Sequence, residues 1–96
     1  MPFKVVIEPR AVTDIQQAID YYDEQLPGLG ERFHAALSEH IAAVAVNPFY
    51  QVRYKDYRAL PINKFPYLLI FYTDEPKQTV NIIAVFNTSQ STAKLP

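Results

Sequence analysis

The sequence predicts a single domain of the α+β class, in which a short strand and a helical hairpin precede an antiparallel sheet. Three observations predict this class. Apolar residues repeat at helical spacing in two segments before Pro48, β-branched and aromatic residues gather in short runs after it, and only a few residues separate those runs. The chain has 96 residues, which is the length of one domain, so we expect residues 1–96 to form one unit.

The part before Pro48 is predicted to form one strand and two helices. Residues 3–7 are apolar and β-branched, which favours a strand, and proline at position 9 is typical of a first helical turn. The inner face of the first helix carries Ala11, Ile15, Ala18, Ile19, Tyr22 and Leu26. After a break at Pro27-Gly28, the second helix carries Leu29, Phe33, Ala36, Leu37, His40, Ile41 and Val44. The connection is short, so the helices should lie antiparallel.

The part after Pro48 is predicted to form an antiparallel meander. Four runs rich in Val, Ile and Tyr cover residues 52–54, 57–62, 67–73 and 78–86. Their connections are too short for parallel crossovers and suit hairpins. Residues 68–71 are apolar on both faces, which predicts a central strand. From Asn87 the sequence becomes polar, and residues 88–96 are predicted to be a loose tail.

Composition excludes several classes of site. The chain has no cysteine, so it holds no thiolate-ligated zinc or iron–sulfur cluster. Its two glycines both fall in the helical turn, which leaves no glycine-rich phosphate loop. His34 and His40 are six residues apart on one helix and point in different directions, so they do not chelate one metal. We therefore expect no cofactor and no metal.

Three further polar features of the helices are interpreted as structural. His34 shares a face with Glu31 and Ser38, and the three are read as a surface stripe. The acidic cluster Asp20, Asp23 and Glu24 is read as a solvated helix face. His40 falls on the apolar stripe and is predicted to be a partly buried histidine with satisfied ring nitrogens.

Hydropathy indicates a cytoplasmic protein. No apolar stretch approaches the roughly 20 residues that span a bilayer, and the N-terminal apolar run is too short for a signal peptide. We expect no membrane partner.

Charge divides the chain into an acidic half and a basic half. Residues 1–47 carry three basic and seven acidic residues, a net charge of −4, whereas residues 48–96 carry six basic and three acidic residues, a net charge of +3. Four cations lie among four tyrosines over a short stretch: Arg53, Lys55, Arg58 and Lys64 with Tyr50, Tyr54, Tyr57 and Tyr67. Such a set suits phosphate contact and base stacking. It equally suits ordinary strands with Lys and Arg stems over aromatic neighbours.

The order of these segments resembles that of the RelE/ParE superfamily of bacterial toxins. The resemblance begins with FKVVIEPRA at residues 3–11 and DIQQAIDYY at 14–22, and continues with PGLGERF at 27–33. It extends through NP at 47–48, VRY at 52–54, Arg58, FPY at 65–67, Tyr72 and IIAVF at 82–86. Each of these segments is short, but together they cover residues 3 to about 95 in the order that is typical of that family.

The resemblance implies a β-α-α-β-β-β(-β) fold and a toxin of a type II toxin–antitoxin, or plasmid-stabilisation, module. A cognate antitoxin would hold the toxin inactive by wrapping it with a helix and a strand. The ParE branch poisons DNA gyrase without cutting anything itself. The RelE branch enters the ribosome and cleaves messenger RNA with basic and aromatic residues and no metal.

The C-terminal part departs from the ribonuclease pattern of that family. Many relatives end the last strand with a histidine, followed by an Arg-Asp-Pro-like stretch and a tryptophan. Here the corresponding residues are Asn87, Gln90, Ser91, Thr92 and Leu95. An amide does not transfer a proton as imidazole does, and glutamine does not clamp a phosphate as arginine does. The net charge of −1 also disfavours a protein that must bind polyanionic RNA.

We therefore predict a ParE-like, non-catalytic toxin that inhibits DNA gyrase and growth, and two alternatives stay open. The first is a metal-independent endoribonuclease that acts on ribosome-bound message, with Arg53, Arg58 and Lys64 stabilising the phosphorane and Tyr72 as acid or base. The second is a non-toxic domain that only binds an antitoxin. The same surface that receives the antitoxin would allow the isolated chain to form a homo-oligomer.

Overall fold

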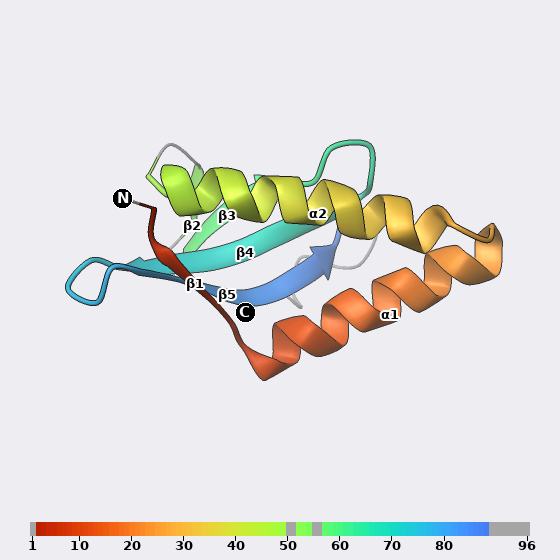
Figure 1. Ribbon diagram of the computed structural model, residues 1–96, viewed down its shortest axis with the longest axis horizontal. Coiled ribbons are helices and arrows are strands. Elements are labelled where there is room, and N and C mark those ends of the chain that lie inside the picture. The colour runs from red at the N-terminus through yellow and green to blue at the C-terminus, as the bar shows by residue number, and fades with distance from the viewer. Residues whose placement is uncertain (1, 50–51, 55–56, 89–96) are drawn as a thin grey trace.

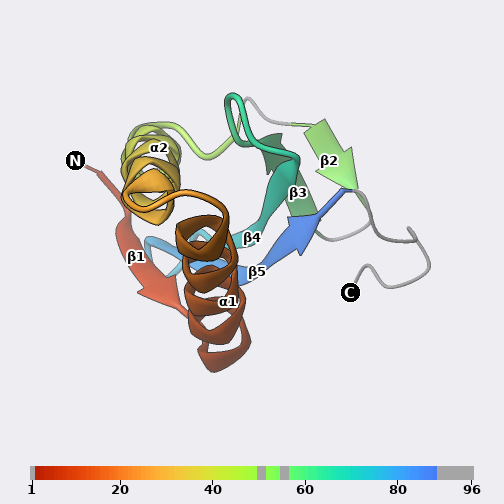
Figure 2. The same cartoon turned by 90° about the vertical axis from the view of Figure 1, so that its right-hand side faces the viewer.

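The computed structural model describes residues 2–49, 52–54 and 57–88, and it confirms the predicted α+β fold. Two helices and five strands follow in the order β1 (Lys4–Ile7), α1 (Pro9–Gln25), α2 (Leu29–Val46), β2 (Val52–Tyr54), β3 (Tyr57–Pro61), β4 (Tyr67–Asp74) and β5 (Thr79–Asn87) (Figure 1). Both helices lie on the same side of the sheet (Figure 2). Lys55 and the predicted tail from Ser89 onward, including Gln90 and Leu95, lie outside the described residues.

The helical hairpin follows from its prolines and glycines. Pro9 occupies the first turn of α1, where its missing N–H costs no hydrogen bond. Gly28 adopts a φ of 90°, a left-handed conformation in which a side chain would be strained, and so turns the chain between the helices. Gly30 lets α2 approach α1 closely, and its N–H donates to the Asp23 carboxylate at 2.9 Å. The hairpin is therefore closed by backbone contact as well as by side chains.

The sheet has the order β1-β5-β4-β3-β2, so β4 occupies the middle as predicted. Strands β2 to β5 form the predicted antiparallel meander. The sequence did not indicate a partner for β1, which joins the sheet in parallel with β5, with Lys4 opposite Thr79 and Ile7 opposite Ile82. This pairing makes the sheet mixed and leaves β1 and β2 at its two outer edges (Figure 2).

A β-bulge in β5 changes which of its side chains face the helices. Ile70 is opposite Ala84 and Phe71 is opposite Ile82, which leaves Ile83 as an extra residue. Before the bulge Ile82 belongs to the core under the helices, and after it Val85 does so. The alternation is thus shifted by one residue at the end of β5.

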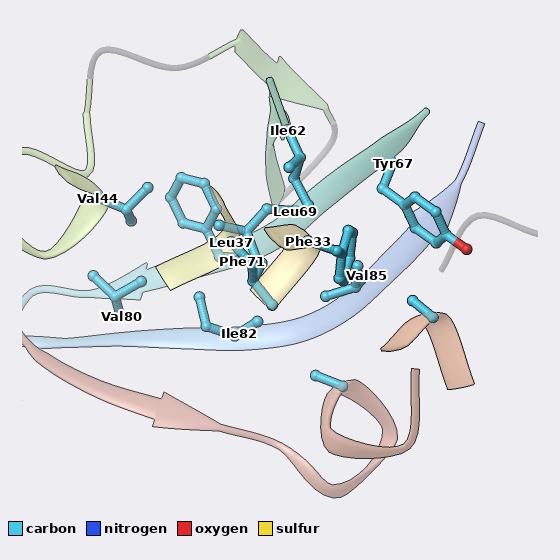
Figure 3. Packing of buried hydrophobic residues seen from close by; sticks show 12 residues of the cluster. Phe33, Leu37, Val44, Ile62, Tyr67, Leu69, Phe71, Val80, Ile82 and Val85 are labelled. Carbon is cyan, nitrogen blue, oxygen red and sulfur yellow. The ribbon is translucent and has the colours of Figure 1, made fainter. Parts of the chain in front are cut away.

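The main core lies between the helices and the sheet. Phe33, Leu37 and Val44 of α2 lie against side chains of β4 and β5 (Figure 3). The fully buried members include Phe71, Leu69, Ile82 and Val80. A smaller cluster of Ile70, Ala84 and Phe86 occupies the other face of the sheet. Among the described residues, neither helix is long and apolar enough to cross a membrane.

Candidate functional site

The structure brings Arg53 and Arg58 opposite each other on β2 and β3. The guanidinium of Arg58 donates a hydrogen bond from Nη1 to the carbonyl oxygen of Phe49 at 3.1 Å, and its Cζ lies 5.7 Å from the centroid of the Phe49 ring. Phe49 in turn meets Phe3 edge to face, with 5.9 Å between ring centroids. Arg58 therefore ties the sheet to the segment that follows α2, which is a structural role.

Tyr72 lies on the other face of the sheet from Arg58. Arg58 is opposite Phe71 of β4, so both side chains point toward the helices, where Phe71 is fully buried. Successive residues of a strand face opposite sides, and Tyr72 therefore points away from the helices. The predicted ribonuclease set is thus divided between two faces.

Lys64 is separated from both residues because it lies in the turn between β3 and β4. Its φ is 71°, and its side chain is exposed. It lines a groove of about 620 Å³ between this turn and α2, together with Leu29, Arg32, Ala35, Ala36, Glu39, Asn63 and Phe65. Its charged lining residues are Arg32, Lys64 and Glu39, so the groove combines two cations with one carboxylate.

A second hollow, which we name the β5 recess, lies between α1 and the end of β5. It has a volume of about 220 Å³ and is lined by Arg10, Asp14, Gln17, Ala18, Tyr21, Tyr67, Val85, Phe86 and Asn87. The bulge in β5 accounts for its position, because it turns Val85 toward the helix layer. The lining of the recess therefore includes a cation, a carboxylate, two phenols and two carboxamides.

Asp14 connects α1 to the strand across this recess. Strand β1 pairs with β5 only as far as Ile82, so the N–H of Val85 lies beyond the reach of β1. The Asp14 carboxylate accepts that N–H at 3.1 Å and also lies 3.9 Å from Nε of Arg10. Asp14 thus supplies the acceptor that a longer β1 would have supplied.

We expect Asp14→Ala to lower the free energy of unfolding by about 1–3 kcal/mol, because it leaves a partly buried N–H without its acceptor. Asp14→Asn keeps an oxygen in the same place and should cost less. Arg10→Ala is the matched control, since its exposed pair contributes roughly 0.5 kcal/mol or less. Urea unfolding followed by circular dichroism measures all three. Equal losses for Asp14→Ala and Arg10→Ala would contradict this role of the carboxylate.

The phenols of Tyr67 and Tyr22 are unsuited to act as bases at neutral pH. Burial raises the pKa of Tyr67, and the nearby Tyr21 and Asp14 raise it further, whereas a hydrogen bond with the Asn87 side chain lowers it. Burial also raises the pKa of Tyr22, with smaller contributions from Tyr67 and Tyr21. Both phenols therefore stay protonated and serve as hydrogen-bonding and packing groups.

The histidines have the structural character that their positions predicted. The Nδ1 atom of His40 lies 2.7 Å from the carbonyl oxygen of Ala36. Its Nε2 atom accepts a hydrogen bond from the Asn63 N–H at 3.4 Å. These partners require the tautomer with the proton on Nδ1. His34 is exposed on α2. Within residues 2–49, 52–54 and 57–88, no group of three or more His, Cys, Asp or Glu side chains is placed to hold a metal ion.

The sequence singled out Asn87 and Tyr67 but did not indicate that they lie beside Arg10 and Asp14 in the β5 recess. Arg10 and Asp14 look like an ordinary surface pair on a helix, and Tyr67 looks like one of several strand aromatics. Their meeting depends on the bulge at Ile83, which no local pattern indicates. An acidic residue among the apolar positions of α1 was the available signal, and it was too weak to predict the contact.

The sequence and the fold are similar to those of known toxin proteins. A model of the ParE toxin of the type II toxin–antitoxin system parDE matches residues 5–92. The chain is similar to a structure of the chromosomal ParDE system from P. aeruginosa, with a TM-score of 0.77, 12% identity and coverage of 88% of this chain and 95% of that chain. No curated protein matches the sequence.

Two RelE-type structures are similar as well. The RelBE2 toxin–antitoxin complex from Mycobacterium tuberculosis has a TM-score of 0.65 at 20% identity, with coverage of 94% of this chain and 95% of that chain. The isolated E. coli RelE toxin has a TM-score of 0.65 at 17% identity, with coverage of 95% of this chain and 89% of that chain. At these identities the likeness extends to the fold alone.

Proposed function

Because the chain belongs to the ParE toxin family and is therefore the toxin of a type II toxin–antitoxin system, we propose that it inhibits DNA gyrase by binding and catalyses no reaction itself. The observation that carries this proposal is the separation of Arg58 from Tyr72 on opposite faces of the sheet. Phosphoryl transfer to a ribose hydroxyl requires cations and an acid or base around one phosphate. The described residues of this set do not surround such a place.

The end of β5 supports the same proposal. Asn87 lies opposite Tyr67, and its side chain forms a hydrogen bond with that phenol. The resemblance to the ribonuclease branch would call for a histidine there. A carboxamide donates and accepts hydrogen bonds without exchanging a proton at neutral pH, so Asn87 contributes to packing at the β5 recess and not to acid–base chemistry.

The proposal includes a cognate antitoxin as the partner that silences the toxin. In the M. tuberculosis RelBE2 structure a toxin of this fold is bound to its antitoxin. An antitoxin helix or strand on this chain would use an apolar surface or a sheet edge. Gyrase inhibition would take place in the cytoplasm, arrest growth and, on a plasmid, favour retention of the module.

The proposal is tested with the purified chain and purified gyrase. We expect loss of ATP-dependent supercoiling and accumulation of cleaved DNA, and in cells growth arrest with intact message. The control variant Lys77→Ala should inhibit gyrase as the unmodified chain does, because Lys77 is an exposed residue of the turn between β4 and β5. Normal supercoiling at a saturating concentration of the chain would refute the proposal. Absence of growth arrest would favour a domain that only binds an antitoxin.

One observation favours the ribonuclease as a second candidate, namely the placement of Arg53 and Arg58 opposite each other on neighbouring strands. If these cations stabilise a phosphorane with Lys64, then Arg58→Ala should reduce cleavage of ribosome-bound message by about 10²-fold or more. Lys77→Ala should leave that cleavage unchanged. A translation extract in which the unmutated chain cuts no message removes this candidate.

A further inference from the structure

The outer edge of β1 carries backbone groups that no described residue of this chain pairs with. The N–H groups of Lys4 and Glu8 donate to Gln78 and Ile82 carbonyl oxygens, each at 2.9 Å, and so point toward β5. Alternate residues of a strand direct their backbone groups to opposite sides, so Val5 and Ile7 direct theirs outward. With β1 at the end of the sheet order, this edge is open to an added strand.

The residues that bracket β1 restrict how another strand can pair with it. Pro2 and Pro9 have no N–H. The Phe3 N–H is already donated to the carbonyl oxygen of Ala45 at 2.8 Å. Only Val5 and Ile7 therefore offer donors along this edge, and a partner must match two residues that are two positions apart.

A second copy of β1 meets this requirement in one antiparallel register. With Val6 opposite Val6 of the second copy, Val5 is opposite Ile7 of that copy, and the two strands exchange four hydrogen bonds. The neighbouring register, with Val5 opposite itself, would place Ile7 opposite Phe3, whose N–H is engaged. The open edge thus selects the register centred on Val6.

The same register is complementary in charge. It places Lys4 opposite Glu8 of the second copy at both ends, because the segment reads Lys-Val-Val-Ile-Glu. These are non-hydrogen-bonded positions, where opposing side chains come closest. Among the described residues neither Lys4 nor Glu8 forms an ion pair within its own chain. Val6, which is 38% exposed, would be covered between the two charged ends by Val6 of the second copy. Ile7, which is 40% exposed and lies on the opposite face of the strand, would be covered by Val5 of that copy.

We propose that two copies of this chain associate through antiparallel pairing of β1 with β1, with Val6 on the two-fold axis and Lys4 against Glu8 at each end. The paired segment is short, so the dimer is weak and depends on concentration. The proposal goes beyond gyrase inhibition, and its test does not depend on toxicity.

The test uses charge reversal in the full chain. Sedimentation equilibrium up to roughly millimolar chain should show a monomer–dimer equilibrium for the unmodified protein. Lys4→Glu and Glu8→Lys should each weaken the dimer about tenfold or more, because each change makes both end pairs repulsive. An equimolar mixture of the two variants, and the double variant Lys4→Glu/Glu8→Lys, should restore the affinity. Circular dichroism checks that all the variants are folded.

Three results would overturn the proposal. The first is a monomer at every concentration, and the second is a dimer whose affinity the charge reversals leave unchanged. The third is protection of the Val5 and Ile7 amides from hydrogen exchange only when an antitoxin is bound, which would assign the edge to an antitoxin strand. Rescue in the mixture of the two single variants supports the proposal most directly, because it requires contact between unlike charges of different copies.

Discussion

Phe33→Ala is expected to lower the free energy of unfolding by about 3–5 kcal/mol, as loss of a large buried aromatic ring does. Phe33 is fully buried in α2. Its ring centroid lies 5.1–5.5 Å from those of Tyr22, Phe65 and Tyr67, so it joins α1, α2 and the start of β4. Because a domain is typically stable by about 5–15 kcal/mol, this single change removes a large share of the total.

The experiment is denaturant unfolding of Phe33→Ala beside Phe33→Leu. Leucine fills part of the volume and should cost clearly less than alanine. The near-ultraviolet signal of the aromatic cluster should fall in the alanine variant under native conditions, since three neighbouring rings lose a packing partner. Equal stability of the alanine and leucine variants would show that the ring does not organise this core.

Gly30→Ala should destabilise the fold by about 3 kcal/mol, through overpacking at the helix crossing. A Cβ at Gly30 would lie 2.5 Å from the carbonyl oxygen of Ile19 and 2.8 Å from Cγ of Asp23. The first of these atoms belongs to the backbone of α1, so the helices must separate to admit the methyl group. That separation would also stretch the hydrogen bond from Gly30 N–H to Asp23.

Gly28→Ala provides the matched control for Gly30→Ala, because Gly28 is the residue before α2 and lies two positions from Gly30. Nothing lies within 4 Å of a Cβ built at Gly28, so its cost comes only from the φ of 90°. A left-handed alanine costs roughly 1–2 kcal/mol. Thermal and urea unfolding should therefore rank Gly30→Ala as the more harmful change. The reverse ranking would mean that α1 and α2 separate at little cost to admit the methyl group.

Local patterns were sufficient to predict the helices and the meander. Pro9, Gly28 and Pro48 mark boundaries that the structure retains, and short hairpin connections imply antiparallel strands. The partner of β1 was not predictable in this way, because Val5 pairs with Val80, which is separated from it by most of the sequence. Pairing over such a separation leaves no trace in spacing or composition.

The candidate site was less predictable than the fold, because it depends on register. Whether Arg58 and Tyr72 share a face is decided by the turn between β3 and β4, where Lys64 adopts a positive φ. A shift of one residue would reverse the face of every side chain in the strand. The β5 recess likewise depends on the extra residue Ile83. Sequence spacing identified the polar residues but not which of them meet.

The parallel pairing of β1 with β5 also determines when the sheet can be completed during synthesis. Residues 4–7 are synthesised before residues 79–82, which form their only strand partner among the described residues. The hairpin of α1 and α2 is built from local contacts and can form early, whereas β1 must wait, because contacts distant in sequence form slowly. Until then its apolar side chains stay exposed on a growing chain. Docking of β1 is therefore a late step in maturation of the toxin.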